Sequence, residues 1–355
     1  MTPPDAATDA FADRVSASAL GYFDILSMYL GLRLGLYEAL AGGDALTPAE
    51  LASTAGISDR YAREWLEQQA TRGILEADVS EATPRFRLPA AHAEVLLDGD
   101  SLMFMGASVR QLTSLRNVID QVAAAFRSGG GVPYEAYGDE SVDGQGAGNR
   151  PTFLTTLPNE WLPAIPELHA RLSRPAARLA DVGCGTGWSS IAIARTYPEL
   201  RVDGFDPDEA SIERARRNAD LEGVADRVRF SVADAASIDG PVDVATAFEC
   251  IHDMARPVEV LGSVRRSLAG DGMMLVVDER TRETFTGEPD DLEAFFYGWS
   301  ILDCLPTGMF EQPSAGTGTV MRPDTLRAYA EEAGFSGFDV LPIEHDTFRL
   351  YLLRP

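Results

Sequence analysis

Three glycines and one aspartate carry the clearest chemical pattern in the chain. Residues 179–187 read Leu-Ala-Asp-Val-Gly-Cys-Gly-Thr-Gly, which is typical of a short buried strand that runs into a glycine turn. Gly183, Gly185 and Gly187 allow a sharp turn and a close ligand approach, and the N–H groups of the helix that follows would face that ligand. The next strand-like run ends at Asp206, whose carboxylate is placed to accept hydrogen bonds from a ribose diol. This spacing predicts a nucleoside-binding βαβ unit.

The spacing of the glycines also separates one nucleotide-binding motif from another. A dinucleotide fingerprint, Gly-x-Gly-x-x-Gly, would need its third glycine at position 188, where this chain has Trp188. A phosphate-binding loop needs a lysine, but all 30 basic residues of this chain are arginine. The missing lysine also rules out a Schiff base and a lysine general base. Neither common phosphate-binding motif therefore fits.

Alternating strand and helix patterns from residue 178 onward would position these groups. After the first strand we predict four more, separated by helices, and a final strand pair, at 201–205, 228–232, 242–248, 273–277, 338–343 and 347–353. This order predicts an α/β fold, in which a doubly wound sheet holds its ligands at the carboxyl ends of its strands.

Further polar residues follow directly after the predicted strands. Asp234 comes after the third strand, His252 and Asp253 follow the fourth, and Glu279 follows the fifth. Because these strand ends share one edge of the sheet, they predict a single site. Histidine is the side chain most easily poised near neutral pH, so we interpret His252 as a general base rather than a packed histidine. Side chains of adjacent residues diverge on regular backbone, which leaves Glu249 or Glu279, rather than Asp253, to orient the imidazole.

The segment 20–40 has a helical pattern that is apolar nearly all round. One side carries Leu20, Phe23, Leu30 and Leu34, and another carries Ile25, Tyr29, Leu32 and Leu36. A helix with two apolar faces is buried by its own domain on one side and by something else on the other. We expect a second copy of the chain, and hence a homodimer. Residues 1–18 are expected to be a disordered or loosely docked lead.

Residues 46–88 have the pattern of a winged helix-turn-helix. Thr47 can cap a first helix, Gly73 ends a second, and 74–77 with 85–88 could pair as a two-stranded wing. Nucleic-acid binding is the obvious reading, but acidic side chains outnumber basic ones in this region and the net charge of the chain is −25. Phosphate contacts need positive charge, so we expect no nucleic-acid partner.

Two segments outside the sheet could contribute to an acceptor pocket. A helix is predicted at 101–126, and the glycine-rich stretch 128–150 is a hinge, a lid or a mobile linker, in which Tyr134 either closes over a ligand or packs in the core. The insertion 280–322 carries three aromatic residues, which line either a hydrophobic acceptor pocket or the core: Phe295, Phe296 and Trp299.

Composition narrows the setting of the protein. The polar, acidic N-terminus is no signal peptide, and no apolar run approaches the ~20 residues of a membrane span. The 3 cysteines are few and widely spaced, which argues against a disulfide framework. We expect a cytoplasmic protein with no membrane partner.

Together these features resemble the Rossmann-like (class I) methyltransferases that use S-adenosylmethionine (SAM). A winged-helix dimerisation domain (1–100), a helical, glycine-rich connecting and lid segment (101–160) and a SAM-binding catalytic domain (161–355) look like the small-molecule O-methyltransferases of natural-product pathways, and closer still like a group of actinobacterial methyltransferases with the same winged-helix start. The resemblance implies transfer of a methyl group from SAM, with S-adenosylhomocysteine as product, to a small hydrophobic or aromatic acceptor.

The resemblance also suggests roles for individual residues. In this family the glycine loop meets the methionine part of SAM, a carboxylate at the place of Asp234 faces the adenine amino group, and the histidine of a His-Asp pair takes the proton of the acceptor hydroxyl. His252 and Asp253 stand at the place of that pair, although the usual tryptophan after it is Met254 here. The residues expected to bind the cofactor are Asp181, Gly183, Cys184, Gly185, Gly187, Asp206, Pro207, Asp234, Ala235 and Glu249.

Other functions remain open at this stage. The same fold could methylate carbon or nitrogen, could keep SAM while catalysing a different reaction, or could sense a ligand and regulate through the winged helix. Asp278 and Glu279 could suggest a metal, as in catechol-type methyltransferases, but the ligand pattern of that family is incomplete here and we expect no metal.

Overall fold

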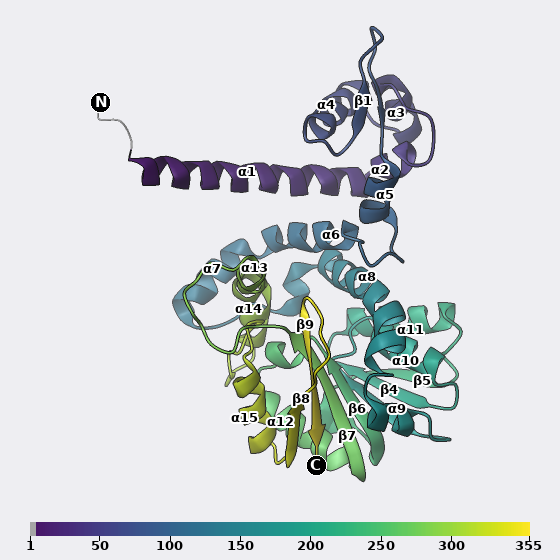
Figure 1. Cartoon of the computed structure of the whole chain (residues 1–355), viewed down its shortest axis with the longest axis vertical. Coiled ribbons are helices and arrows are strands. Elements are labelled where there is room, and N and C mark those ends of the chain that lie inside the picture. Colours follow the sequence, from purple (N-terminus) through teal and green to yellow (C-terminus); the bar gives the residue numbers. More distant parts are fainter. Residues whose placement is uncertain (1–4) are drawn as a thin grey trace. The chain divides into compact units, whose positions relative to one another are not determined.

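The computed structural model describes residues 5–355, and Figure 1 shows its elements. The chain divides into two compact units, one of Met1–Thr113 with Asp143–Pro151 and the other of Ser114–Val142 with Thr152–Pro355. The first unit is mainly helical and contains the winged-helix region, and the second contains the large sheet. The predicted fold class, an α/β sheet preceded by a helical winged-helix region, is confirmed.

The first unit folds around a single apolar core that includes Trp65, Leu66 and Phe86. Its helices and strands are α1 (Ala6–Arg33), α2 (Leu36–Leu40), α3 (Pro48–Ala55), α4 (Asp59–Thr71), β1 (Glu76–Asp78), β2 (Arg85–Arg87), α5 (Ala90–Leu97) and α6 (Gly106–Ser114). Thr47 caps α3 through a capping box with Glu50, and β1 pairs antiparallel with β2 as the predicted wing.

Helix α1 differs from the expectation for the N-terminus. Residues 6–18, expected to be a loose lead, belong to this helix, while Met1–Pro4 lie outside the described residues. The segment 20–40 is two helices, because Gly35 turns the chain with φ +68° between α1 and α2. By length and composition α1 is the one described helix that could cross a membrane, which is weak evidence for a span in a helix so near the N-terminus.

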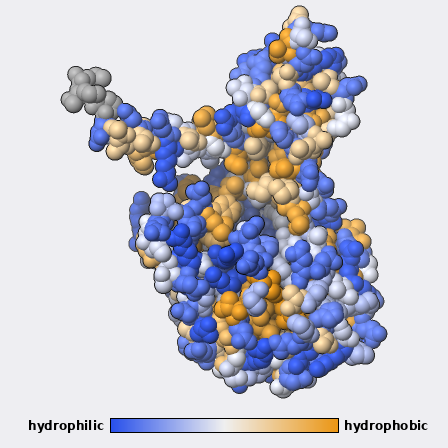
Figure 2. Space-filling model, viewed as in Figure 1, coloured by the Kyte–Doolittle hydropathy of each residue, from blue (hydrophilic) through white to orange (hydrophobic). Residues whose placement is uncertain are grey.

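The two apolar sides of α1 meet different surroundings. Tyr29 and Leu32 are buried in the core of the first unit, and α1 is tied to α4 by the Trp65 indole N–H, which donates to the Ser27 carbonyl over 3.0 Å. On the other side, four apolar residues stay exposed: Leu20, Phe23, Leu30 and, just after the helix, Leu34. Figure 2 shows hydrophobic colours among the hydrophilic ones along α1. Within one chain, therefore, one apolar face of α1 is buried and the other is exposed, which is the difference that the sequence predicts.

The connecting region is more regular than its glycine content suggested. The helix predicted at 101–126 is broken into α6, a 3-10 turn η1 (Leu115–Asn117) and α7 (Ile119–Ser128), and the stretch expected to be a linker or lid contains η2 (Tyr134–Tyr137) and α8 (Asp139–Thr156). Gly144 explains part of this order, since a Cβ there would lie 3.0 Å from the Gln111 side chain of α6. Small residues let α8 pack closely, where composition alone indicated flexibility.

The second unit is built on a seven-stranded sheet with strand order β5-β4-β3-β6-β7-β9-β8. Its strands are β3 (Arg178–Val182), β4 (Arg201–Asp206), β5 (Val228–Val232), β6 (Val242–Phe248), β7 (Leu268–Glu279), β8 (Gly337–Val340) and β9 (Phe348–Arg354). β3 to β7 run parallel, and β9 is antiparallel to both of its neighbours. Since β4 and β5 lie on one side of β3 whereas β6 and β7 lie on the other, the strand order reverses between β3 and β6. That reversal is where an open α/β sheet binds its ligands.

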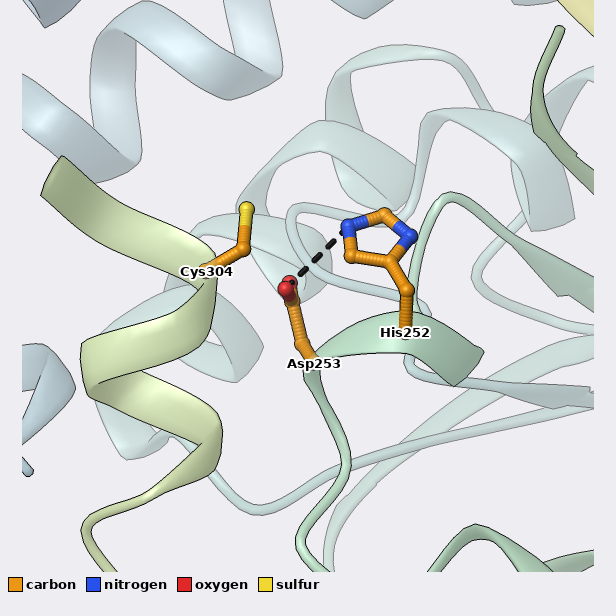
Figure 3. A group of neighbouring side chains, drawn as sticks. All are labelled: His252, Asp253 and Cys304. Atoms are coloured by element: carbon orange, nitrogen blue, oxygen red, sulfur yellow. Dashed lines mark ion pairs between the residues drawn. The ribbon is translucent and has the colours of Figure 1, made fainter. Parts of the chain in front are cut away.

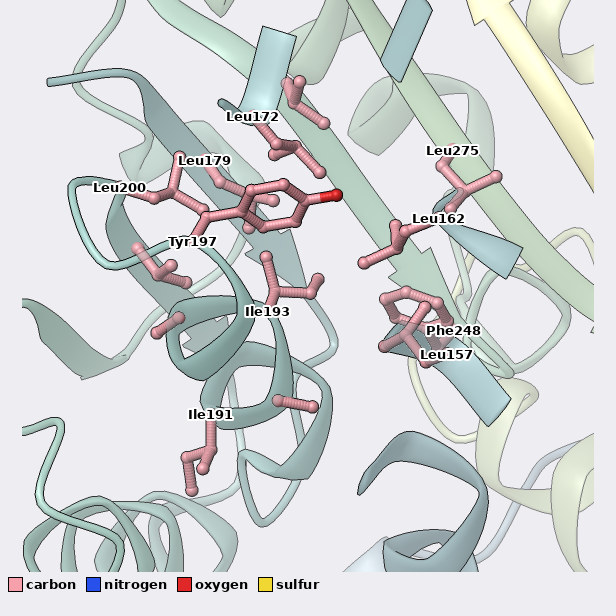
Figure 4. Packing of buried hydrophobic residues seen from close by; sticks show 14 of the residues in the cluster. Leu157, Leu162, Leu172, Leu179, Ile191, Ile193, Tyr197, Leu200, Phe248 and Leu275 are labelled. Atoms are coloured by element: carbon pink, nitrogen blue, oxygen red, sulfur yellow. The ribbon is translucent and has the colours of Figure 1, made fainter. Parts of the chain in front are cut away.

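Helices cover both faces of the sheet. Alternate strand residues enter two separate cores, so that Leu179 faces one and Ala180 the other. The first core, part of which Figure 4 shows, packs the sheet against α9 (Pro166–Leu172), α10 (Trp188–Thr196) and α11 (Glu209–Leu221). The second packs it against α12 (Pro257–Ser267) and α15 (Pro323–Glu332).

An insertion between β7 and α15 places further residues near the strand ends. It contains α13 (Asp291–Trp299), a π-helical turn η6 (Ser300–Cys304) and α14 (Leu305–Gly308). Asp290 caps α13 through the Glu293 N–H at 2.9 Å, and Arg322 pairs with the buried Glu293 carboxylate. The connecting region docks on the same insertion, because the Tyr137 hydroxyl donates to the Leu302 carbonyl over 2.9 Å.

Candidate active site

The glycine loop has the conformation that its sequence requires. Gly183, Gly185 and Gly187 all have positive φ, at +65°, +50° and +83°. A Cβ on Gly187 would lie 2.6 Å from the Phe230 ring, so this glycine is needed for packing against β5. At Gly185 no other atom lies within 4 Å of the Cβ position, and the loop backbone is therefore open to a ligand there. Cys184 between them is buried.

Asp206 connects the end of β4 to this loop. Its carboxylate accepts hydrogen bonds from the Gly185 N–H and from the Asp208 N–H, each at 2.9 Å. Burial raises the pKa of Asp206 to about 6, although those two hydrogen bonds oppose the shift. The side chain is half-buried beside the open position at Gly185.

Asp181 takes a different place from the other residues of the motif. It is fully buried, and its carboxylate accepts hydrogen bonds from the hydroxyls of Ser189 (2.6 Å), Ser190 (2.6 Å) and Thr246 (2.7 Å). These bonds join β3 to the first turn of α10 and to β6. The carboxylate thus fixes the start of the helix that follows the glycine loop.

The remaining cofactor candidates lie at the carboxyl ends of β4, β5 and β6. Pro207 and Asp234 are exposed, Ala235 is buried, and the Asp234 carboxylate caps the turn that follows through the Ala236 N–H at 2.9 Å. Glu249 has φ +53°, a conformation that non-glycine residues rarely adopt, directly after β6. Burial raises the pKa of Glu249.

His252 lies in the 3-10 turn η5 (Ile251–Asp253) and is almost completely buried. Its Nδ1 is 2.8 Å from Asp278 Oδ1 and 3.2 Å from Glu279 Oε2, at the end of β7. Its Nε2 is 3.1 Å from Asp253 Oδ1. The expectation that the His252 and Asp253 side chains diverge is therefore wrong, because the tight 3-10 turn brings the two side chains together instead of alternating them as a strand would.

Charge around the imidazole sets the protonation of the whole group. Burial alone would lower the pKa of His252, but the charges of Asp253, Asp278 and Glu279 outweigh it and hold this pKa well above its ordinary value. Burial would raise the pKa of Asp278, yet the charge and hydrogen bond of His252 lower it overall. Burial raises the pKa of Glu279. These directions favour an imidazolium paired with the Asp278 carboxylate.

The residues predicted to contact the acceptor differ in how far they are buried. Phe296 is buried, whereas Phe295 is exposed and Trp299 half-buried, with their rings edge-to-face at a centroid distance of 6.1 Å. Burial, followed by the charges of Asp303 and Asp206, raises the pKa of Tyr134 well above its ordinary value. Tyr134 thus lies within electrostatic reach of both the carboxylate after β4 and the insertion.

The structure adds residues that the sequence interpretation did not assign to the site. Asp278 is the nearest partner of His252 Nδ1. The sequence pattern indicates it only as a metal ligand, although it is the first carboxylate after the buried run of β7 and therefore lies at the same edge of the sheet. Asp303 and Cys304 come from η6, inside an insertion where no motif marks them. Burial raises the pKa of Asp303 to about 7.

Two stretches of the chain match models of known families. Residues 173–300 match a family model described as a methyltransferase domain, and residues 24–97 match one described as an Rv2258c-like winged HTH domain. Among curated proteins, 27-O-demethylrifamycin SV methyltransferase of Amycolatopsis mediterranei is 35% identical over 108 residues, which cover 30% of this chain and 39% of that protein. The chain matches well under two thirds of that relative.

Solved structures extend the similarity of fold over nearly the whole chain. The mitomycin 7-O-methyltransferase MmcR is 20% identical with a TM-score of 0.73, over 99% of each chain. Human N-acetylserotonin methyltransferase, solved in complex with SAM, is 18% identical with a TM-score of 0.67, over 100% of this chain and 99% of that one. At such identities the agreement concerns the fold.

Proposed function

Since the chain carries a methyltransferase domain behind a winged-helix domain, we propose that it is a SAM-dependent methyltransferase that methylates a hydroxyl of a small hydrophobic or aromatic acceptor, with His252 as general base. The observation that carries the proposal is the place of His252, buried after β6 and held at Nδ1 by Asp278. The open glycine loop and Asp206 end neighbouring strands of the same sheet edge. This placement supports a single site that combines a proton acceptor with a nucleoside contact.

The residues at this edge fit SAM. The backbone at Gly185 is open, Asp206 presents a carboxylate beside it, and Asp234 follows the neighbouring strand β5. When bound, SAM supplies a methyl group activated by a sulfonium.

The chain itself would orient the acceptor and move one proton. Asp278 accepts the Nδ1–H of His252, so the imidazole presents Nε2 once it has lost its second proton. Nε2 then takes the proton of the acceptor hydroxyl as the oxygen attacks. The acceptor is proposed to be held, and water excluded, by three aromatic residues. Tyr134 comes from the connecting segment 101–160, and Phe295 and Trp299 come from the catalytic domain 161–355.

Ligand binding tests this proposal directly. Protein purified under native conditions should release SAM or S-adenosylhomocysteine in mass spectrometry, and the stripped protein should bind both in calorimetry. ATP and NAD serve as matched controls, because the chain lacks both phosphate-binding patterns, and neither should bind. A stripped, folded protein that binds neither SAM nor its demethylated product would disprove the proposed cofactor.

We assign the winged-helix domain, residues 1–100, to dimerisation rather than to nucleic acid. Two arginines are already paired: Arg60 of α4 with Glu64, and Arg72, directly after α4, with Asp24. The exposed side of α1 instead offers apolar surface to a second copy. With free cysteines throughout, we place this homodimer in the cytoplasm.

The dimer should depend on the exposed side of α1. In sedimentation the wild type is expected at twice the 38.3 kDa of the chain, whereas Phe23→Asp with Leu30→Asp should give a monomer, because charge replaces apolar contact. Leu221→Asp changes an equally apolar side chain, 84% exposed on α11, and should leave the dimer intact. A wild-type monomer at micromolar concentration would contradict this assignment.

A further inference from the structure

Three potential metal ligands meet on the Nε2 side of His252. Figure 3 shows the imidazole and the Asp253 carboxylate, both from η5, beside the Cys304 thiol from η6. The ligand atoms of the three residues all lie within 4.8 Å of one another. Nε2 and Asp253 Oδ1 are 3.1 Å apart and form an ion pair when the imidazole is protonated. Apart from this contact with His252, the buried Asp253 oxygen has no partner among the described residues.

The other ring nitrogen is held in the way that metal sites require. Asp278 Oδ1 lies 2.8 Å from Nδ1 and also accepts the Glu279 N–H at 3.0 Å, so both the ring and its carboxylate partner are fixed. A histidine that binds a metal usually donates its second N–H to such a carboxylate, which orients the ring and fixes its tautomer. Here that arrangement leaves Nε2 facing Asp253 and Cys304, and its lone pair becomes available once the imidazolium has lost its second proton.

From this arrangement we propose that His252, Asp253 and Cys304 bind one zinc ion. Imidazole, carboxylate and thiolate are the ligand types of zinc sites, with bonds of about 2.0–2.3 Å. Two ligand atoms on a tetrahedral ion with such bonds lie about 3.3–3.6 Å apart, so shifts of about 1 Å would complete the triad. The Asp253 side chain is 35% exposed and gives the ion a path from solvent.

Zinc bound at this place would prevent His252 from acting as a general base. The ion occupies the Nε2 lone pair that a hydroxyl proton would otherwise take, and binding releases the protons that the imidazole and the thiol carry. The site therefore makes zinc an inhibitor that competes for His252. The inhibitory effect of zinc rests on the proposed role of His252, whereas zinc binding itself can be measured whether or not SAM binds.

Zinc affinity and cobalt spectra test the triad. In calorimetry, full-length protein stripped with chelator should bind one zinc ion, and Cys304→Ser should weaken binding by more than about tenfold. Cys250→Ser is the matched control, since Cys250 is also half-buried nearby but its thiol donates to the Val182 carbonyl at 3.2 Å, and it should bind zinc as the wild type does. Cobalt in the wild type should show a thiolate charge-transfer band that Cys304→Ser lacks.

A labelling measurement keeps the test valid if Cys304→Ser does not fold. In the wild type, zinc should protect Cys304 from alkylation, as located by mass spectrometry, without protecting Cys250. A cation held instead on the Nδ1 side, by Asp278 and Glu279, would bind with no cobalt–thiolate band and no protection of Cys304. That result, or the absence of zinc binding, would overturn the proposal.

Discussion

His252→Gln is expected to lower the turnover of methyl transfer by about 10²–10⁴ while changing SAM affinity only a few-fold. Glutamine keeps a polar side chain of similar length but cannot take the acceptor proton, so chemistry should suffer and cofactor binding should not. His169→Gln is the matched control, because His169 is bonded to the Tyr197 hydroxyl at 2.8 Å, on α9, and should leave both quantities unchanged. Turnover and calorimetry on the three proteins separate catalysis from binding.

The dependence of the methyl-transfer rate on pH also tests whether His252 is the general base. A base acts only when deprotonated, so the wild-type rate should rise with pH through the pKa of His252. Burial lowers this pKa, but Asp253, Asp278 and Glu279 outweigh burial, and the inflection should therefore lie above the ~6.5 of an ordinary histidine. Asp278→Asn removes one of these charges and should move the inflection to lower pH, with a lower plateau because the ring loses its orienting partner.

Two outcomes would change the interpretation of His252. An acceptor that is already ionised needs no base, and the loss in His252→Gln would then shrink to a modest alignment effect. A variant with full turnover and an unchanged pH profile would show that His252 only packs or positions the substrate. Methylation of carbon or nitrogen would then explain the activity better than methylation of oxygen.

The parts of the fold that were predictable from sequence are those in which one local pattern determines both an element and its place. The run 242–248 is mostly apolar and contains three β-branched residues, and the structure has β6 over Val242–Phe248. Gly187 must be glycine because of Phe230, and its position in the sequence already marked the turn. Strand ends then meet at one edge by topology alone, which is why residues from separate motifs could be assigned to one site.

The remaining features depend on packing that no local pattern records. Composition indicated that 128–150 was flexible. In the structure, however, Gly144 allows α8 to pack closely against α6. Asp278 and Glu279 both lie close to His252 Nδ1, at 2.8 Å and 3.2 Å, and only the folded structure shows that Asp278 is the nearer of the two. Cys304 is brought to η5 by an insertion without a motif. Such contacts between distant segments are set by tertiary structure rather than by spacing.

Asp206→Ala should weaken SAM binding about ten- to over a hundredfold. A carboxylate that accepts charge-assisted hydrogen bonds from a ribose diol contributes roughly 1.5–3 kcal/mol to binding. The structure adds a second reason, because the same carboxylate holds the Gly185 N–H at 2.9 Å and its loss frees the glycine loop. Asp203→Ala is the matched control on β4, since that carboxylate pairs with Arg178 at 3.2 Å, away from the loop, and SAM affinity should not change.

Titration distinguishes the ribose contact from a loosened loop. With a pKa of about 6, Asp206 is ionised at neutral pH and becomes protonated as the pH falls, so SAM affinity in the wild type should decrease below about pH 6. Asp206→Asn can still accept the Gly185 N–H through its amide oxygen but carries no charge, and its weaker affinity should lose this dependence on pH. Calorimetry that found the same affinity and the same pH dependence in both proteins would remove Asp206 from the ribose, and would leave it a residue that only supports the loop.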